Sequence, residues 1–356
     1  MLSMLIALAA QAAAQTAAPP AKVWRTHEQD VILKDFRFRG GESLPEVRMH
    51  VTTLGSPHRN AAGEIDNAVM VLHGTGGDGK QFLRPQFADE LYGPGQPLDI
   101  NRYWIILPDN IGHGKSSKPS DGLRMKFPKY DYDDMVEAQR QMLAGLGITH
   151  MRLIMGTSMG CMMSFVWGEE HPDFADALMP LACEPIEIAG LNRMWRQMLI
   201  DGIEKDPAWN GGNYTNQPEQ GLRTAASVLV IAGGAPLFLQ KAYPTREAAK
   251  AYAEQAVERY IGEMDANDTI YQFESSRNYN PWPNLEKITA PMMWVNSADD
   301  FINPRNLDVP QKAAKRMKNA QFRLIPESAG THGHGTHTWA KFWKADLSAL
   351  LARTAK

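Results

Sequence analysis

The chain has 356 residues, enough for one large domain with an insertion or for two domains. Hydrophobic residues make up 44% of it and charged residues 22%, a composition typical of globular proteins. The formal net charge of −3 offers no basic surface for a phosphate backbone, so the composition argues against nucleic-acid binding.

The first twenty residues differ in composition from the rest. Residues 1–10 are apolar, an alanine-rich stretch follows, residues 12–14 fit an A-x-A cleavage site, and Pro19-Pro20 begins an extended linker. The apolar run is too short to span a bilayer, so residues 1–20 are predicted to form a secretory signal peptide and a linker. The expected protein is therefore periplasmic or secreted, without a stable membrane span. Because no Lys or Arg precedes the apolar residues, a flexible alanine-rich tail is the alternative.

Strand-like and helix-like segments alternate along the chain. Residues 31–38 and 47–53 predict an antiparallel pair. The continuous apolar runs that follow suit parallel strands buried on both faces: residues 68–72, 103–107, 151–155, 177–182, 292–295 and 322–325. Helix-compatible stretches such as residues 133–146 separate several of them. The alternation predicts an α/β fold with a mostly parallel, doubly wound sheet.

The strand pattern stops between residues 184 and 286. This stretch contains a loop rich in Gly, Asn and Pro at residues 210–221 and a helical segment at residues 246–264. It predicts a helical lid insertion over the carboxyl edge of the sheet, where α/β folds bind ligands. The core is then split into a first part, residues 21–183, and a second part, residues 287–356.

The segment Gly156-Thr157-Ser158-Met159-Gly160 fits the pattern G-x-S-x-G. It follows an apolar strand and precedes a helix-compatible stretch, the context of a nucleophile elbow. Such a sharp turn strains the central residue and requires small neighbours, so that the serine hydroxyl projects above the sheet. A glycine-rich turn without catalytic function is the alternative, but the context favours Ser158 as a nucleophile.

A nucleophilic serine needs a base to take its proton and an acid to hold that base. In proteins with a nucleophile elbow the serine comes first in the sequence, then the acid, then the histidine. Asp299 and Asp300 follow the strand at residues 292–295, so either lies at the right place for the acid. Either aspartate could orient a histidine. We prefer Asp300 because of its spacing from the strand and from Pro304.

The base is expected in the loop at residues 331–338, which contains three histidines. The turn at Gly333-His334 favours His334, with His332 and His337 in reserve. The same three side chains could instead ligate a metal ion. No matching set of Cys or carboxylate residues accompanies them, so no metal site is predicted.

When a serine attacks an ester, the carbonyl oxygen becomes an oxyanion that needs hydrogen-bond donors. Two backbone N–H groups are expected to supply them. The N–H of Met159 follows the serine, and the N–H of Thr75 lies in the glycine-rich loop after the strand at residues 68–72. That loop also fits G-x-G-x-x-G, so a nucleotide-binding protein is a remote alternative. Gln81 stands where a phosphate loop needs Ser or Thr, and Arg84-Pro85 interrupt the helix. No cofactor is predicted.

Only two cysteines occur, Cys161 and Cys183. Both lie beside predicted core strands or helices. We therefore expect buried free thiols rather than a disulfide framework.

These motifs resemble the α/β-hydrolase superfamily and, within it, the homoserine O-acetyltransferase-like branch, from about residue 31 to the C-terminus. The narrower resemblance is carried by residues 134–139 and 206–214, by Trp167 and by Arg196-Gln197. It implies that Ser158, Asp300 and His334 form a catalytic triad and that Arg196 borders the acyl-acceptor pocket. It also implies a homodimer.

The chain departs from that branch at three motifs. Ala226 stands where the family has an arginine, and Gly335 stands where the family has an aspartate after the histidine. Cys161 replaces the second glycine after the nucleophile turn. Together with the predicted export, these departures favour hydrolysis of a small-molecule carboxylic ester through an acyl-serine intermediate. The alternative is an O-acyltransferase of the homoserine O-acetyltransferase type, in which an alcohol replaces water as the second nucleophile.

Overall fold

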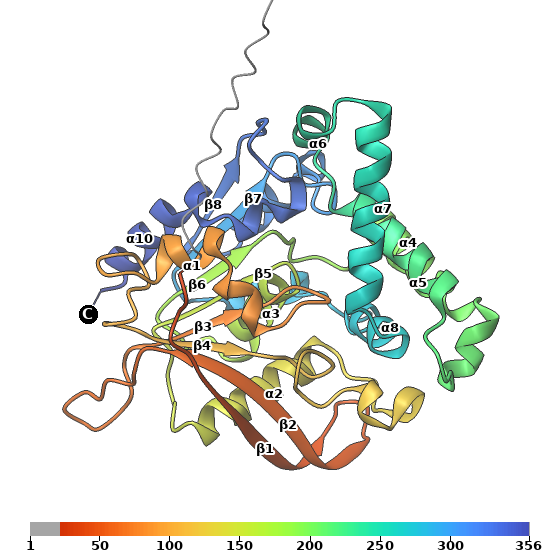
Figure 1. Cartoon of the computed structure of the whole chain (residues 1–356). Coiled ribbons are helices and arrows are strands. Elements are labelled where there is room, and N and C mark those ends of the chain that lie inside the picture. Colours follow the sequence, from red (N-terminus) through yellow and green to blue (C-terminus); the bar gives the residue numbers. More distant parts are fainter. Residues whose placement is uncertain (1–21, 356) are drawn as a thin grey trace, which may run out of the picture.

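The computed structural model describes residues 22–355, which form an eight-stranded sheet between two layers of helices (Figure 1). The strand order is β1-β2-β4-β3-β5-β6-β7-β8. β2 runs antiparallel to β1 and to β4, and all other neighbours are parallel. The strands are β1 His27–Arg37, β2 Ser43–Leu54, β3 Ala68–Leu72, β4 Trp104–Pro108, β5 Leu153–Thr157, β6 Leu178–Leu181, β7 Met292–Ser297 and β8 Ala320–Ile325.

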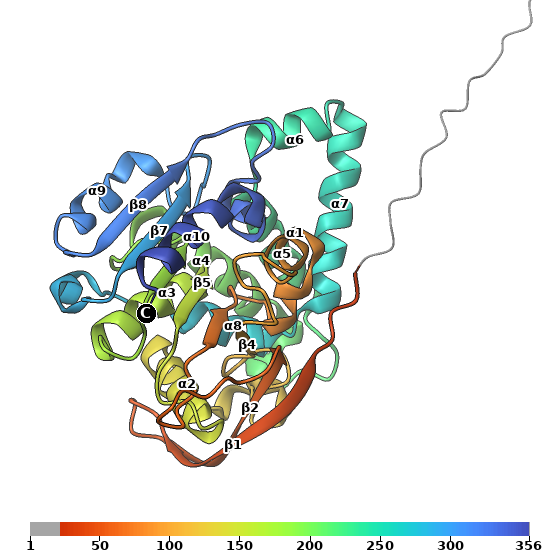
Figure 2. The same cartoon turned by 90° about the vertical axis from the view of Figure 1, so that its left-hand side faces the viewer.

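All eight predicted strands are present, and the central ones are buried along their whole length. Apolar side chains on both faces of these strands pack against helices on either side. β1 and β2 each begin four residues before the predicted start. Their first residues are largely exposed, so backbone pairing extends the strands where the hydrophobic pattern has ended. Figure 2 shows this hairpin at one edge of the sheet, opposite β8.

Two separate hydrophobic cores flank the sheet. One contains apolar residues of α2, α3 and α9, and the other contains those of α1 and α10. These helices are α1 Pro85–Leu91, α2 Tyr132–Gly145, α3 Met159–Glu170, α9 Val309–Ala314 and α10 Lys344–Arg353. Short 3-10 segments connect elements at η1 Gly79–Leu83, η2 Pro119–Asp121, η3 Arg124–Lys126, η4 Pro207–Gly212, η5 Trp282–Lys287, η6 Arg305–Leu307, η7 Gly333–Thr338 and η8 Ala340–Phe342.

Five helices stand between β6 and β7, in the stretch that the sequence assigns to a lid. They are α4 Gly190–Glu204, α5 Glu219–Ala232, α6 Pro236–Ala242, α7 Arg246–Glu263 and α8 Ala266–Glu274. α4, α5 and α8 share a third hydrophobic core, which includes Leu199, Leu222 and Phe273. The long helix α7 stands beside the sheet, between α6 and α8 (Figure 1). No single helix among residues 22–355 has the length and apolar character to cross a bilayer, and only α5 and α6 taken together, with a bend of 103° between them, meet that test.

The expectation of free thiols is wrong. Cys161 in the first turn of α3 and Cys183, just after β6, form a disulfide, with their Cα atoms 5.8 Å apart. Parallel pairing of β5 with β6 brings these positions together at the carboxyl edge of the sheet. The predicted signal segment, residues 1–20, lies outside the described residues.

Candidate active site

Ser158 occupies a sharp turn between β5 and α3. Its backbone has φ +55° and ψ −110°, in the positive-φ region that residues other than glycine avoid. A Cβ at Gly156 would lie 2.2 Å from the carbonyl oxygen of Gly160, and one at Gly160 would lie 2.1 Å from that of Leu72. Only glycine fits at either position, so the sequence pattern and the strained turn explain each other.

His334 lies between Ser158 and Asp300. Its Nε2 is 2.8 Å from Ser158 Oγ, and its Nδ1 is 2.8 Å from Asp300 Oδ2. η7 carries the histidine, and the loop after β7 carries the aspartate. The structure therefore brings together the three residues that the sequence singles out, in the order that lets a carboxylate hold an imidazole against a hydroxyl.

The carboxylate of Asp300 is fully buried and hydrogen-bonded. The backbone N–H of Ile302 donates to it over 2.8 Å, and the side-chain amide of Asn303 donates over 2.9 Å. Burial alone raises the pKa of Asp300, but the charge and hydrogen bond of His334, together with these donors, hold that pKa below its ordinary value. Asp300 is therefore an anion against which a positive charge on His334 is stabilised.

Asp299 has a different set of partners. Its Oδ2 accepts hydrogen bonds from Thr331 Oγ1 over 2.8 Å and from the N–H of Gly333 over 3.1 Å. These contacts brace the loop that carries His334, while Asp300 contacts the imidazole itself. The geometry thus distinguishes two aspartates that the sequence left as alternatives.

Neither reserve histidine is hydrogen-bonded to the serine hydroxyl in the described residues. His332 stacks on Trp339, with ring centroids 4.4 Å apart. His337 is hydrogen-bonded through Nδ1 to the carbonyl oxygen of His334, and burial, then the nearby charge of His334, lower the pKa of His337 to about 3. Among residues 22–355, no group of three or more His, Cys, Asp or Glu side chains could hold a metal ion.

The glycine-rich loop after β3 lies directly against the serine. A Cβ at Gly74 would be 3.4 Å from Ser158 Cβ, and Gly76 adopts φ +75° in a turn closed by a 3.0 Å bond from Gly77 N–H to the Gly74 carbonyl oxygen. The N–H of Thr75, in this turn, and that of Met159, first residue of α3, have no hydrogen-bond acceptor in the described part of the chain. The five-residue η1 that follows ends at Leu83, so the loop does not open a long helix like that of a nucleotide site.

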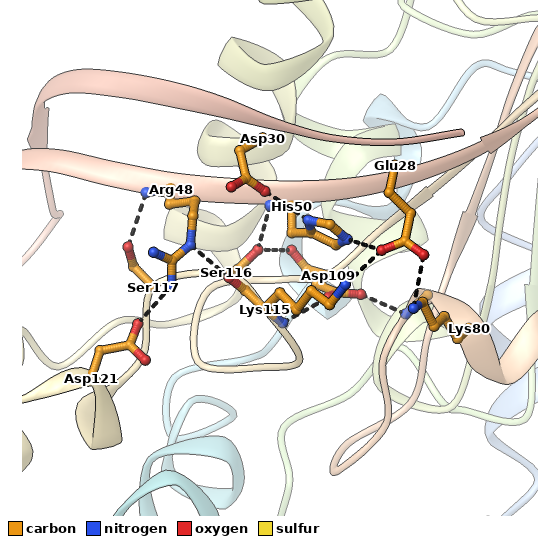
Figure 3. A network of polar contacts seen from close by, with 11 residues as sticks. Glu28, Asp30, Arg48, His50, Lys80, Asp109, Lys115, Ser116, Ser117 and Asp121 are labelled. Carbon is orange, nitrogen blue, oxygen red and sulfur yellow. Dashed lines mark hydrogen bonds and ion pairs between the residues drawn. The ribbon is translucent and has the colours of Figure 1, made fainter. Parts of the chain in front are cut away.

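A network of polar contacts fixes the far end of this loop (Figure 3). Asp109 accepts hydrogen bonds from the N–H of Gly79 and from that of Lys115, each over 2.8 Å. Glu28 of β1 pairs with Lys80 Nζ at 2.9 Å and with Lys115 Nζ at 2.6 Å, and hydrogen bonds from Lys115 and then Lys80 lower the pKa of Glu28 to about 2. The N-terminal hairpin therefore anchors the loop, a role that nothing in the local sequence around Glu28 indicates.

Ser158, His334 and Thr75 open onto a cavity of about 810 Å³ whose other wall is built by α4, α5, α7 and α8. Arg196 of α4 lines it and is only 2% exposed. Its guanidinium lies over the rings of Trp195 and Phe273, at 4.8 and 5.5 Å, and donates to Asn192 Oδ1 over 2.9 Å. Within residues 22–355 no carboxylate lies within 4.0 Å of it. Burial lowers the pKa of Arg196, and a buried cation without an anion favours binding of an anionic ligand.

A family model described as the alpha/beta hydrolase fold matches residues 67–337. A probable acyltransferase from Methanothermobacter thermautotrophicus is 29% identical over 85% of this chain and 91% of its own length. Homoserine O-acetyltransferase from Pelobacter propionicus is 27% identical over the same shares of the two chains.

Two solved structures show the same fold. Homoserine O-acetyltransferase from Bacillus anthracis superimposes with a TM-score of 0.80 at 21% identity, covering 94% of this chain and 100% of its own. An acetylester hydrolase from Corynebacterium glutamicum also gives a TM-score of 0.80, at 19% identity, covering 92% of this chain and 96% of its own. The predicted fold class is confirmed. Because a transferase and a hydrolase match equally well, the fold does not distinguish the two reactions.

Proposed function

The chain belongs to the α/β-hydrolase fold family, and from this premise we propose that it is a serine acyltransferase that moves an acyl group from an ester to the hydroxyl of a small, carboxylate-bearing acceptor. The observation that carries the proposal is the pair of 2.8 Å contacts linking Asp300, His334 and Ser158, at a cavity that also contains the buried Arg196.

In the first half-reaction, Ser158 Oγ attacks the carbonyl carbon of the donor ester while His334 Nε2 takes the hydroxyl proton. Asp300 stabilises the imidazolium, and the N–H groups of Thr75 and Met159 bind the carbonyl oxygen as it becomes negatively charged. His334 then gives its proton to the leaving alcohol, and an acyl-serine remains. In the second half-reaction His334 takes a proton from the acceptor hydroxyl as its oxygen attacks the acyl carbon. His334 then returns the proton to Ser158 Oγ as the bond between the acyl carbon and Oγ breaks.

Arg196 supports a carboxylate on the acceptor. A guanidinium can bind a carboxylate through two parallel hydrogen bonds, and this one has no protein carboxylate as a partner in the described residues. The names of the two relatives, an acyltransferase and a homoserine O-acetyltransferase, point to the same class of reaction.

The charges around the cavity support a simple ester as the donor. The lining contains four basic side chains, Lys80, Arg84, Lys118 and Arg196, and four acidic ones, Asp78, Glu263, Asp265 and Asp268. Lys80 is also paired with Glu28. The lining therefore has no excess of positive charge with which to attract a donor that carries several phosphates.

Hydrolysis is the second candidate, with water as the acceptor. It is favoured by Ala226 and Gly335, which replace an arginine and an aspartate of the acetyltransferase pattern. The disulfide supports the predicted export, because disulfides persist in oxidising compartments. An exported enzyme would meet extracellular esters.

The homodimer that the family resemblance implies remains a prediction.

The test is to supply p-nitrophenyl acetate with L-homoserine or with 3-amino-1-propanol, which lacks the carboxylate, and to separate acyl transfer from hydrolysis by mass spectrometry. The transferase proposal predicts an O-acetylated product with homoserine and little with the amino alcohol. It predicts that Arg196→Met raises the KM for homoserine by about 10- to 100-fold and leaves hydrolysis nearly unchanged. Product limited to acetate at every acceptor concentration would favour hydrolysis instead.

A further inference from the structure

Thr75 carries a hydroxyl group for which residues 22–355 provide no hydrogen-bond partner. Its Oγ1 is buried from solvent, and no polar atom of the described residues forms a hydrogen bond with it. A buried hydroxyl left unpaired costs about 1–3 kcal/mol, and few such groups occur in native proteins. The neighbouring Thr157 shows the ordinary case, since its Oγ1 accepts a 3.1 Å hydrogen bond from Gln81 Nε2.

The position of Thr75 indicates what the missing partner is. The residue follows Gly74, which packs against Ser158, and it lines the same cavity as Ser158 and His334. Its backbone N–H also lacks an acceptor among residues 22–355. Rotation about the Cα–Cβ bond moves the hydroxyl among three staggered positions without moving the backbone. Oγ1 is shielded from the cavity in the present rotamer, and this rotation can bring the hydroxyl beside the N–H of Thr75 and the nucleophile.

We propose that the Thr75 hydroxyl donates a further hydrogen bond to the oxyanion of the tetrahedral intermediate, beside the N–H groups of Thr75 and Met159. This inference rests on the proposed acyl-serine chemistry. When Ser158 Oγ bonds to the acyl carbon, the carbonyl π electrons move onto oxygen, and the hydroxyl donates its hydrogen without transferring the proton. Because the charge exists only near the transition state, the bond increases kcat and leaves substrate binding almost unchanged.

The test compares Thr75→Val, which replaces the hydroxyl by a methyl group, with Thr75→Ser, which keeps it. With p-nitrophenyl acetate, Thr75→Val is expected to lower kcat by about 100-fold with KM nearly unchanged, and Thr75→Ser to stay within about threefold of the wild type. Affinity for an alkyl boronic acid, which forms a tetrahedral anion on serine, should fall with kcat in Thr75→Val.

Thr52 of β2 offers a matched control. Its Oγ1 is also buried and has no partner in the described part of the chain, but the residue does not line the cavity. Thr52→Val removes the same group at no cost to any hydrogen bond, so kcat should not change. Should Thr75→Val fail to fold, Thr75→Ala makes the same comparison with the serine variant.

Wild-type kcat in Thr75→Val, or equal losses in Thr75→Ser and Thr75→Val, would overturn the inference. The proposed function is tested separately by labelling of wild-type Ser158 with a fluorophosphonate. A labelled wild type together with a fully active Thr75→Val enzyme defeats this inference alone, whereas an unlabelled wild type defeats the proposed function.

Discussion

The Cα of Gly333 packs against the carbonyl oxygen of Gly234, so that a Cβ at position 333 would lie 2.6 Å from that oxygen. Gly333 immediately precedes His334, and Gly234 lies in the turn between α5 and α6 of the lid. The lid thus touches the loop that carries the imidazole. Further contact comes from Phe238 of α6, whose ring centroid is 4.3 Å from that of His332.

Gly333→Ala should displace His334 as well as strain the backbone, because residue 333 adopts φ +56°. A misplacement of about 1 Å can cost roughly 100-fold in rate, so we expect a fall in kcat of that order. Gly335→Ala is the matched control on the other side of the histidine, since its Cβ would meet nothing nearer than His332 Cβ at 3.7 Å. Steady-state kinetics check the pair, and equal activity of both variants would contradict the account.

Asp300→Asn should lower kcat by about 10³- to 10⁴-fold while the protein stays folded, because the amide cannot stabilise the imidazolium. Asp299→Asn should be much less harmful to kcat, since Asp299 contacts Thr331 and Gly333 and not the imidazole. Because Asp299→Asn loosens the loop, it should instead lower the melting temperature of the protein. A reversal of the two effects would show that Asp299 is the acid of the triad.

Glu184 follows the disulfide-bonded Cys183, and its Oε1 is buried without a hydrogen-bond partner in the described residues. Burial, and secondly the charge of Asp300, raise the pKa of Glu184 to about 7 from an ordinary value of 4.5. The folded state holds this proton more tightly than the unfolded state. The stability that protonated Glu184 contributes is therefore fully present below pH 4.5 and is lost as pH rises through 7.

Glu184→Gln should therefore gain unfolding free energy relative to the wild type, by about 2 kcal/mol between pH 4.5 and pH 7.5. Urea unfolding at several pH values measures this difference. A difference that stays constant over the range would mean that Glu184 ionises normally in the folded protein.

Reduction of the Cys161–Cys183 disulfide should lower the unfolding free energy by about 3 kcal/mol, because the crosslink closes a loop of 22 residues in the unfolded chain. Urea unfolding with and without dithiothreitol measures the effect. The double variant Cys161→Ser, Cys183→Ser should be unresponsive to the reductant. Equal stability of oxidised and reduced protein would show that the bond does not constrain the chain.

The sequence was informative where function depends on local pattern. Ser158 stands in a five-residue motif, and His334 follows a glycine in a short histidine-rich loop, so both could be found without a tertiary structure. Sequence spacing favoured Asp300 over Asp299 but could not decide between them, because the directions of adjacent carboxylates are set by the folded loop.

The sequence did not reveal contacts between residues that only the folded sheet brings together. The cysteines meet because β5 and β6 pair in parallel, and a sequence separation of 22 does not reveal this. Glu28 reaches Lys80 and Lys115 from an edge strand whose alternating polar residues look like any solvated hairpin. Arg196 was found by resemblance. Its burial, and the absence of a carboxylate partner among residues 22–355, follow from the tertiary structure.

The central claim is that Ser158 becomes acylated because His334 takes its proton. The most direct measurement is intact-protein and peptide mass spectrometry after acid quench of the enzyme with p-nitrophenyl acetate. The account predicts one added acetyl group on the peptide that contains Ser158 in the wild type, and none in Ser158→Ala or, on the same time scale, in His334→Ala. Ester cleavage without that adduct and undiminished in Ser158→Ala would contradict it.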